Sequence, residues 1–118
     1  MAWTFLAPTR MTASPALIAL CTCPDAETAE RLARSAVEAR HAACVNIVEG
    51  VRSVYRWAGA VTVDREVLLI AKTTAAAWPA LADLWRAGHP YELPELIAVP
   101  VALGSADYLT WLSDSVSS

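Results

Sequence analysis

An amphipathic segment that follows an apolar strand constrains the fold of this chain most. Residues 16–23 are β-prone and bounded by prolines, which favours a buried strand. Asp25 then suits a helix N-cap, and the apolar residues after it recur at helical spacing, at Ala29, Leu32, Ala33, Ala36 and Val37. We expect this helix to end with Arg40 and His41 in its last turn, where basic side chains favour the helix dipole.

Two long β segments come next and predict a hairpin. Residues 42–57 form its first arm, and Gly50 inside that arm indicates a bulge or a bend. A turn at Ala58-Gly59, or just after it, leads into an antiparallel arm over residues 61–72. Because both arms are long, we expect the hairpin to reach beyond the body of one small domain.

The last part of the chain predicts a helix, a strand and a short final helix. Thr73 or Thr74 caps the first of these helices, which covers residues 75–87 and has Trp78, Leu81, Ala82 and Trp85 on its inner face. A strand over residues 95–103 contains Pro100, which places that position at a sheet edge or a bulge. The final helix opens at residues 104–107.

The resulting order of elements is β-α-β-β-α-β-α. Two right-handed strand–helix–strand crossovers fold it into a four-stranded antiparallel sheet with two helices on one face. We therefore expect an α+β fold, a ferredoxin-like βαββαβ sandwich with a short C-terminal helix. Residues 1–14 show no sustained periodicity and are expected to be a loose N-terminal arm, so that residues 15–118 form a single domain.

Composition excludes several classes of function. The 118 residues are 56% hydrophobic and 18% charged, which argues against disorder. A net charge of −3 argues against a nucleic-acid partner. No apolar run approaches the roughly twenty residues of a membrane-spanning helix, so we expect no membrane partner. The N-terminus carries no convincing secretory signal and the three cysteines form no dense disulfide pattern, so we expect a cytoplasmic protein.

The surplus of apolar residues predicts a subunit interface. Five tryptophans are more than a domain of this size easily buries, and the expected fold leaves one sheet face without helices. Alternation along the first hairpin arm puts Tyr55 and Trp57 on one face, either as ordinary core or as interface anchors. We favour the interface, because aromatic anchors are enriched where subunits meet.

Six short blocks of sequence, in order along the chain, resemble the divalent-cation tolerance protein family, CutA. They are Cys21-Thr-Cys-Pro-Asp25, Ala42-Ala-Cys-Val-Asn46, Ser53-Val-Tyr-Arg-Trp57, Lys72-Thr-Thr74, His89-Pro-Tyr-Glu-Leu-Pro-Glu95 and Tyr108-Leu-Thr-Trp-Leu112. The resemblance extends from about Leu17 to Ser115. It implies a ferredoxin-like subunit assembled as a homotrimer similar to the PII signalling proteins, and a role in tolerance of copper and other divalent metal ions. It implies no established catalytic reaction, so we expect a protein that is not an enzyme.

The resemblance also implies metal ligands. In family members described as copper-binding, the ligands are the thiol that opens the Cys-Thr-x-Pro-Asp motif and two adjacent histidines before Pro-Tyr. Cys21 and His89 match two of these positions, whereas Gly88 stands where the first histidine would be. Cys23 could supply the third ligand, since alternate residues of a strand share a face. The simpler alternative is a pair of packed thiols, and a Cys21–His89 nucleophile pair is a third interpretation that lacks a recognisable orienting group.

A second hypothesis of function rests on analogy with the PII fold. Lys72, Tyr91, Glu92 and Glu95 could converge where subunits meet and form a cleft for a small anionic metabolite. The alternative is structural: Tyr91 packs under its prolines, Glu95 pairs with a base, and Lys72 is a solvated strand end.

Overall fold

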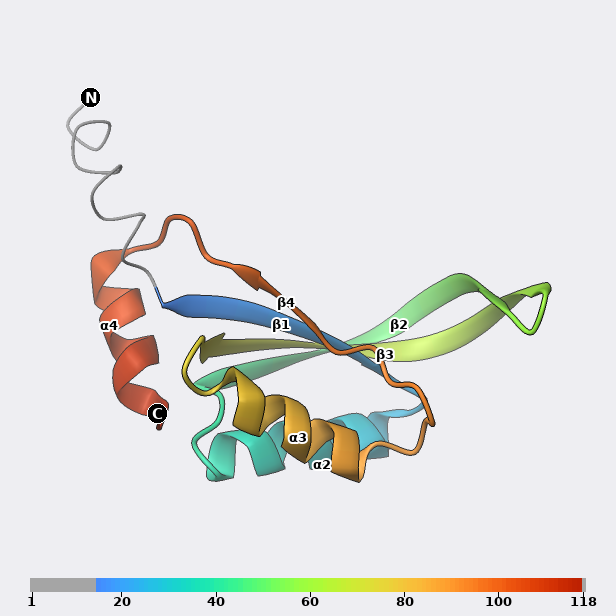
Figure 1. The fold of residues 1–118 in the computed structure, drawn as a ribbon, viewed down its shortest axis with the longest axis horizontal. Coiled ribbons are helices and arrows are strands. Elements are labelled where there is room, and N and C mark those ends of the chain that lie inside the picture. Colours follow the sequence, from blue (N-terminus) through green and yellow to red (C-terminus); the bar gives the residue numbers. More distant parts are fainter. Residues whose placement is uncertain (1–14, 118) are drawn as a thin grey trace.

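The computed structural model describes residues 15–117, so the expected N-terminal arm lies outside the described residues. Its elements follow the predicted order and form an α+β fold, as expected (Figure 1). They are β1 (Ala16–Cys23), α2 (Ala26–Glu38), β2 (Cys44–Trp57), β3 (Ala60–Thr74), α3 (Trp78–Gly88), β4 (Ile97–Pro100) and α4 (Ala106–Ser115). None of the helices within residues 15–117 is both long and apolar enough to cross a membrane.

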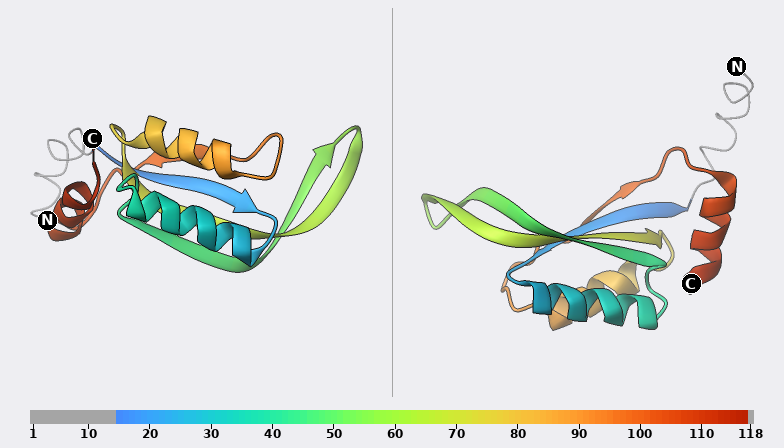
Figure 2. Two further views of the ribbon diagram at one scale, coloured as in Figure 1. Left: turned by 90° about the horizontal axis from the view of Figure 1, so that it is seen from below. Right: turned by 180° about the vertical axis from the view of Figure 1, so that it is seen from behind.

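The four strands form one antiparallel sheet in the order β2-β3-β1-β4. Helices α2 and α3 lie side by side against one face of this sheet (Figure 2). Alternate residues of the two central strands point toward these helices and are buried: Ala19, Cys21, Cys23, Val67, Leu69 and Ala71. The largest side chain in this core is Trp85 of α3, which is 0% exposed and donates a hydrogen bond from Nε1 to the carbonyl oxygen of Leu32 at 2.9 Å.

Among residues 15–117, no helix covers the opposite face of the sheet, and the middle of this face is apolar. The register pairs Leu20 of β1 with Ile70 of β3 and with Ile97 of β4, so these three side chains share the uncovered face. We call this surface the open face and define it by its apolar members: Ile18, Leu20, Val48, Leu68, Ile70, Ile97 and Val99. Each of them is at least partly exposed in a single subunit. The uncovered sheet face predicted from the sequence is therefore present.

Strands β2 and β3 continue past the sheet as a projecting hairpin (Figures 1 and 2). The register shifts between Val48 and Val51, and Gly50 within the shift has φ +80°, as the predicted bulge requires. A two-residue turn closes the hairpin, with φ 51° at Ala58 and 80° at Gly59. The hairpin contributes to an elongated subunit of 50 × 30 × 22 Å.

The first helix ends earlier than the sequence predicted. It stops at Glu38, and no basic residue lies in its last turn. Arg40 lies beyond the helix with φ 63°, and its guanidinium donates a hydrogen bond to the backbone oxygen of Asp114 in α4 at 2.9 Å. The carbonyl of Arg40 accepts another from the amide of Ser117 at 2.8 Å. Arg40 thus links the C-terminal helix to the rest of the domain. It does not lie in the last turn of α2, where its charge would interact favourably with the helix dipole.

Two further predicted boundaries are wrong. The helix expected from residue 75 starts at Trp78, because Thr73 and Thr74 belong to β3, where Thr74 pairs with Ala16. The Thr74 hydroxyl accepts a hydrogen bond from the amide of Ala77 at 3.2 Å, and so it stabilises the turn before the helix. The strand expected over residues 95–103 is limited to Ile97–Pro100. In the part of the chain that the structure describes, it pairs only with β1, which fits a proline at a sheet edge.

Candidate metal cluster and acidic groove

Cys21, Cys23 and His89 come together near the end of β1. Their ligand atoms all lie within 4.8 Å of one another, from elements more than sixty residues apart in sequence. Cys21 and Cys23 are alternate residues of β1 on the side covered by the helices, whereas His89 follows directly on the end of α3. The structure therefore brings the two predicted ligands together, and it places Cys23, the third ligand that the sequence suggested, beside them.

Both ring nitrogens of His89 are engaged with backbone. Nε2 lies 2.8 Å from the carbonyl oxygen of Thr22, and Nδ1 lies 3.1 Å from the amide nitrogen of Tyr91. A carbonyl only accepts and an amide N–H only donates, so this pattern assigns the proton to Nε2 and leaves Nδ1 as the acceptor. His89 thereby fastens the loop after α3 to the end of β1. To bind a metal ion through Nε2, the ring must give up its bond to Thr22.

The two thiols form a buried pair, each 0% exposed. The hydrogen bond with Cys23 and burial both raise the pKa of Cys21. The same hydrogen bond lowers the pKa of Cys23. A buried thiol whose pKa is raised is a poor nucleophile, and His89 is bonded to backbone atoms instead of activating it. The geometry therefore gives no support to the Cys21–His89 nucleophile pair.

Gly88 occupies a position with little room for a side chain. A Cβ atom added there would lie 3.0 Å from Leu32 Cδ2 and 3.3 Å from Arg31 Nη1. Leu32 is a buried core residue, and Arg31 donates a hydrogen bond to the Gly88 carbonyl at 3.0 Å, so neither moves freely. A second imidazole at this position would require local repacking. Cys23 is the third donor that this subunit offers instead.

A second candidate site is a groove of about 700 Å³ between the hairpin and the loop that precedes β4. Four of its lining residues are carboxylates, three are aromatic, and none is Lys, Arg or His. We call it the acidic groove, and its lining residues are Thr22, Ser53, Val54, Tyr55, Trp57, Asp64, Glu66, Pro90, Tyr91, Glu92, Leu93 and Glu95. It therefore contains Tyr91, Glu92 and Glu95, three of the four residues expected to converge.

Lys72, the fourth residue of that expected group, does not line the groove. Its ammonium donates a hydrogen bond to the Asn46 side chain on the open face. Lys72 and Glu66 are six residues apart on β3, which corresponds to about 20 Å along a strand. Without this lysine the groove has no basic group to attract the anion that the PII analogy suggested.

Two tyrosines donate hydrogen bonds to two of the groove's carboxylates. Tyr91 donates its hydroxyl to Glu66 Oε2 at 3.0 Å, and Tyr55 donates its hydroxyl to Asp64. Burial and the bond to Glu66 raise the pKa of Tyr91, and the bond to Asp64 raises the pKa of Tyr55. Asp64 and Glu66 were not predicted from the sequence. Alternation in β3 places them on one face, but only the position of the loop at residues 90–95 makes that face a site.

Tyr55 and Trp57 lie on the groove side of the hairpin and are not part of the subunit's core. Both are exposed. This rules out the ordinary-core alternative for a single subunit and leaves them free to contact a ligand or a second subunit.

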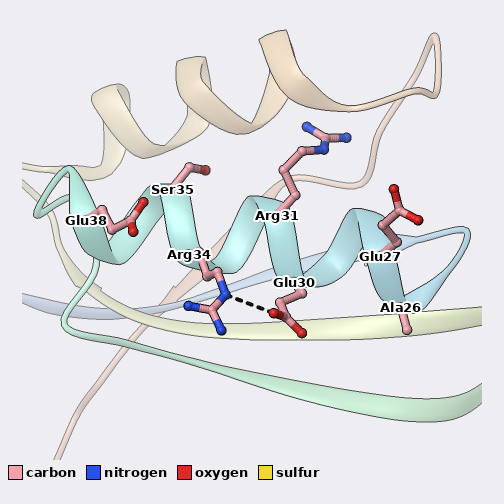
Figure 3. A pocket seen from close by; sticks show the side chains of 7 residues that line it. All are labelled: Ala26, Glu27, Glu30, Arg31, Arg34, Ser35 and Glu38. Atoms are coloured by element: carbon pink, nitrogen blue, oxygen red, sulfur yellow. Dashed lines mark hydrogen bonds and ion pairs between the residues drawn. The ribbon is translucent and has the colours of Figure 1, made fainter.

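A shallow pocket on the outer surface of α2 has a simpler explanation (Figure 3). Most of its lining residues are charged residues of one helix face, among them Glu30 and Arg34. These two form an ion pair at 2.9 Å with one-turn spacing. Such pairs are solvated and contribute little to stability, so we interpret this surface as an ordinary charged helix face.

Comparison with known proteins agrees with this architecture. The family model "CutA1 divalent ion tolerance protein" matches residues 17–115. The chain is 48% identical over 98 residues to "Divalent-cation tolerance protein CutA" of Thermus thermophilus, with 83% of this chain and 95% of that protein covered. It is 45% identical over 102 residues to human "Protein CutA", covering 84% of this chain but only 57% of the longer human protein.

The fold is also similar to a solved structure. The divalent cation tolerance protein of Thermus thermophilus superposes with a TM-score of 0.85 at 46% sequence identity. The superposition covers 86% of this chain and 99% of that chain.

Proposed function

This chain belongs to the CutA1 divalent ion tolerance family, and from that membership we propose that it acts in the response to metal ions as a homotrimer that binds a soft metal ion such as copper. The observation that carries the metal-binding part is the Cys21–Cys23–His89 cluster, with its ligand atoms within 4.8 Å. Two thiols and one imidazole are donors that suit copper or zinc more than magnesium or calcium.

The cluster fits such an ion at the cost of two local changes. The thiols must lose their protons, which ties metal affinity to pH. His89 must exchange its bond to Thr22 for a bond to the ion, or the thiols must bind the ion without it. Burial of both thiols keeps water and competing hard ligands away from the ion.

The open face supports the proposed trimer. It places apolar side chains of all four strands in solvent when the subunit is alone. Burial of apolar surface stabilises by about 25 cal/mol per Å², so joining the open faces of several copies is strongly favourable. A ring of three copies is the closed assembly that the family resemblance implies.

We also propose a binding protein that is not an enzyme and that works in the cytoplasm. The cluster holds a protonated Cys21 thiol and a histidine engaged with backbone, an arrangement suited to holding an ion and not to activating a nucleophile. All three cysteines are free, which fits a reducing compartment. The alternative, a sensor of a small anionic metabolite, gains no support from a groove lined by four carboxylates.

Replacing Cys21 and Cys23 with serine is expected to abolish tight copper binding. The double variant is made in a Cys44→Ser background and titrated with Cu(I), supplied with a competing chelator, by following the chelator's absorbance. We expect one Cu(I) per subunit in the background protein and at least a hundredfold loss of affinity in the triple variant. The reason is that serine hydroxyls do not replace thiolates as ligands for a soft ion.

Cys44 supplies the matched control, since it is a free thiol on a different part of the sheet, in β2. The Cys44→Ser protein must bind Cu(I) as tightly as the natural chain. His89→Ala is expected to weaken binding less than loss of the thiols, because the ring already has other partners. Equal Cu(I) affinity with and without Cys21 and Cys23 would refute the proposed metal site.

A further inference from the structure

The β2–β3 hairpin projects from the domain as a two-stranded ribbon (Figures 1 and 2). The last residue of β1, Cys23, pairs with Val67, so no third strand accompanies residues 51–66 in the part of the chain that the structure describes. The ribbon extends about 20 Å past β1. An isolated two-stranded hairpin is at best marginally stable in water, so this one needs a surface to pack against.

One side of the hairpin is apolar, basic and uncovered. Alternation along β3 puts this side in line with the buried Val67 and Leu69, but the helices that cover those residues do not cover the hairpin (Figure 2). The valines at positions 54, 61 and 63 on this side are 66%, 63% and 58% exposed. We call this side the arginine face, and its members are Arg52, Val54, Arg56, Val61, Val63 and Arg65.

The arginines of this face form no ion pair with a carboxylate among residues 15–117. The two ion pairs found in that range lie within α2 and α3. Arg52 and Arg65 are direct partners in the register, so two like charges face each other across the strands, which is unfavourable. A surface that is both acidic and apolar would compensate this repulsion and cover the valines in one contact.

The same chain carries a surface of that kind on the opposite side of the hairpin. The acidic groove contains four carboxylates and three aromatic side chains. Asp64 and Glu66 alternate with Arg65 along β3, so the groove and the arginine face are the two sides of one ribbon and cannot meet within one subunit. A second copy of the chain is therefore the partner that both surfaces fit.

We propose that the arginine face of one subunit docks against the acidic groove of the next subunit. Arg52 and Arg65 then lie beside Glu92 and Glu95, the exposed carboxylates of the loop before β4. A guanidinium suits this surface because it binds carboxylates in a bidentate manner and also stacks on aromatic side chains. The exposed valines gain the apolar parts of the groove as packing partners.

This contact joins two different surfaces, so each subunit offers its arginine face to one neighbour and its groove to the other. Contacts of this kind use every copy of both surfaces only when they close into a ring. A ring of three is the assembly already proposed. The inference rests on that proposed trimer and adds the hairpin contact that links its subunits beside the joined open faces.

Charge reversal followed by restoration tests the contact. Fluorescence-detected sedimentation over a dilution series measures the concentration at which half of the trimer dissociates. Arg52→Glu with Arg65→Glu should raise that concentration by about tenfold or more, because like charges then meet across the contact. Glu92→Arg with Glu95→Arg should do the same. A chain with all four changes regains opposite charges at the natural net charge, and should return to within about threefold of the natural value.

Two further variants separate this contact from other effects of charge. Arg52→Gln with Arg65→Gln removes the repulsion within each hairpin, so a weakening of about threefold or more identifies the lost partner in another subunit. Arg34→Glu with Arg86→Glu makes the same change of charge as the arginine reversal on the exposed surfaces of α2 and α3, and should stay within about twofold of the natural chain. Circular dichroism verifies that each variant is folded.

The outcomes distinguish this contact from the trimer on which it rests. A natural chain that sediments as a single subunit throughout would overturn the proposed trimer and the hairpin contact with it. A stable trimer would overturn the contact alone in three cases: the arginine reversal leaves it unchanged, the helix control weakens it equally, or the chain with all four changes fails to restore it.

Discussion

Replacing Trp85 with alanine is expected to lower the free energy of unfolding by about 4 kcal/mol. Trp85 of α3 is fully buried in the core cluster that α2, α3 and the sheet share, so its truncation leaves a cavity. The change also removes one of the hydrogen bonds to the Leu32 carbonyl, the one that the indole donates. Chemical denaturation at one fixed protein concentration measures the loss, because unfolding of an oligomer depends on concentration.

Trp85→Phe separates the contribution of the buried apolar volume from that of the indole hydrogen bond. Phenylalanine keeps most of the buried apolar volume but removes the indole hydrogen bond to the Leu32 carbonyl, to which the Ser35 hydroxyl still donates. We expect a smaller loss, of about 1–3 kcal/mol, for that variant. If alanine at this position cost less than about 1 kcal/mol, the packing of α3 described here would be wrong.

Replacing Ile70 with aspartate is expected to dissociate the assembly into folded single subunits. Ile70 lies in the middle of the open face, between Leu20 of β1 and Asn46 of β2 in the register. In a single subunit the aspartate still reaches water, whereas in the proposed trimer it would be a buried and unpaired charge. Sedimentation equilibrium measures the mass, and circular dichroism verifies the fold.

Val37→Asp is the control for Ile70→Asp. Val37 is an exposed apolar residue on α2, the layer on the other side of the sheet. We expect this variant to keep the mass of the natural chain. Unchanged mass for both aspartate variants would show that the open face is not the surface through which subunits meet.

The fold was largely predictable because its apolar pattern changes period at each element. β-Prone residues bounded by prolines over residues 16–23 identified the first strand, helical spacing after Asp25 identified the first helix, and Gly50 marked the bulge. The two wrong helix boundaries have a common cause. Thr73, Thr74 and Arg40 have partners distant in sequence, namely β1 and α4, and local pattern carries no information about such contacts.

The candidate sites were predictable only in part, for the same reason. Cys21 and His89 were identified through the family resemblance, and strand alternation added Cys23. The hydrogen bonds that engage both nitrogens of His89 depend on where the chain returns after α3. Nothing in the local sequence distinguishes Glu66 from an exposed strand residue, because its burial depends on the distant loop at residues 90–95.

The mass of the natural chain in dilute solution tests the central claim most directly. One subunit leaves the apolar open face in water, so we predict that copies of it join to bury that face. Sedimentation equilibrium at low micromolar concentration should give close to three times the 12.6 kDa of one chain. A stable, well-behaved particle of 12.6 kDa under the same conditions would contradict the account.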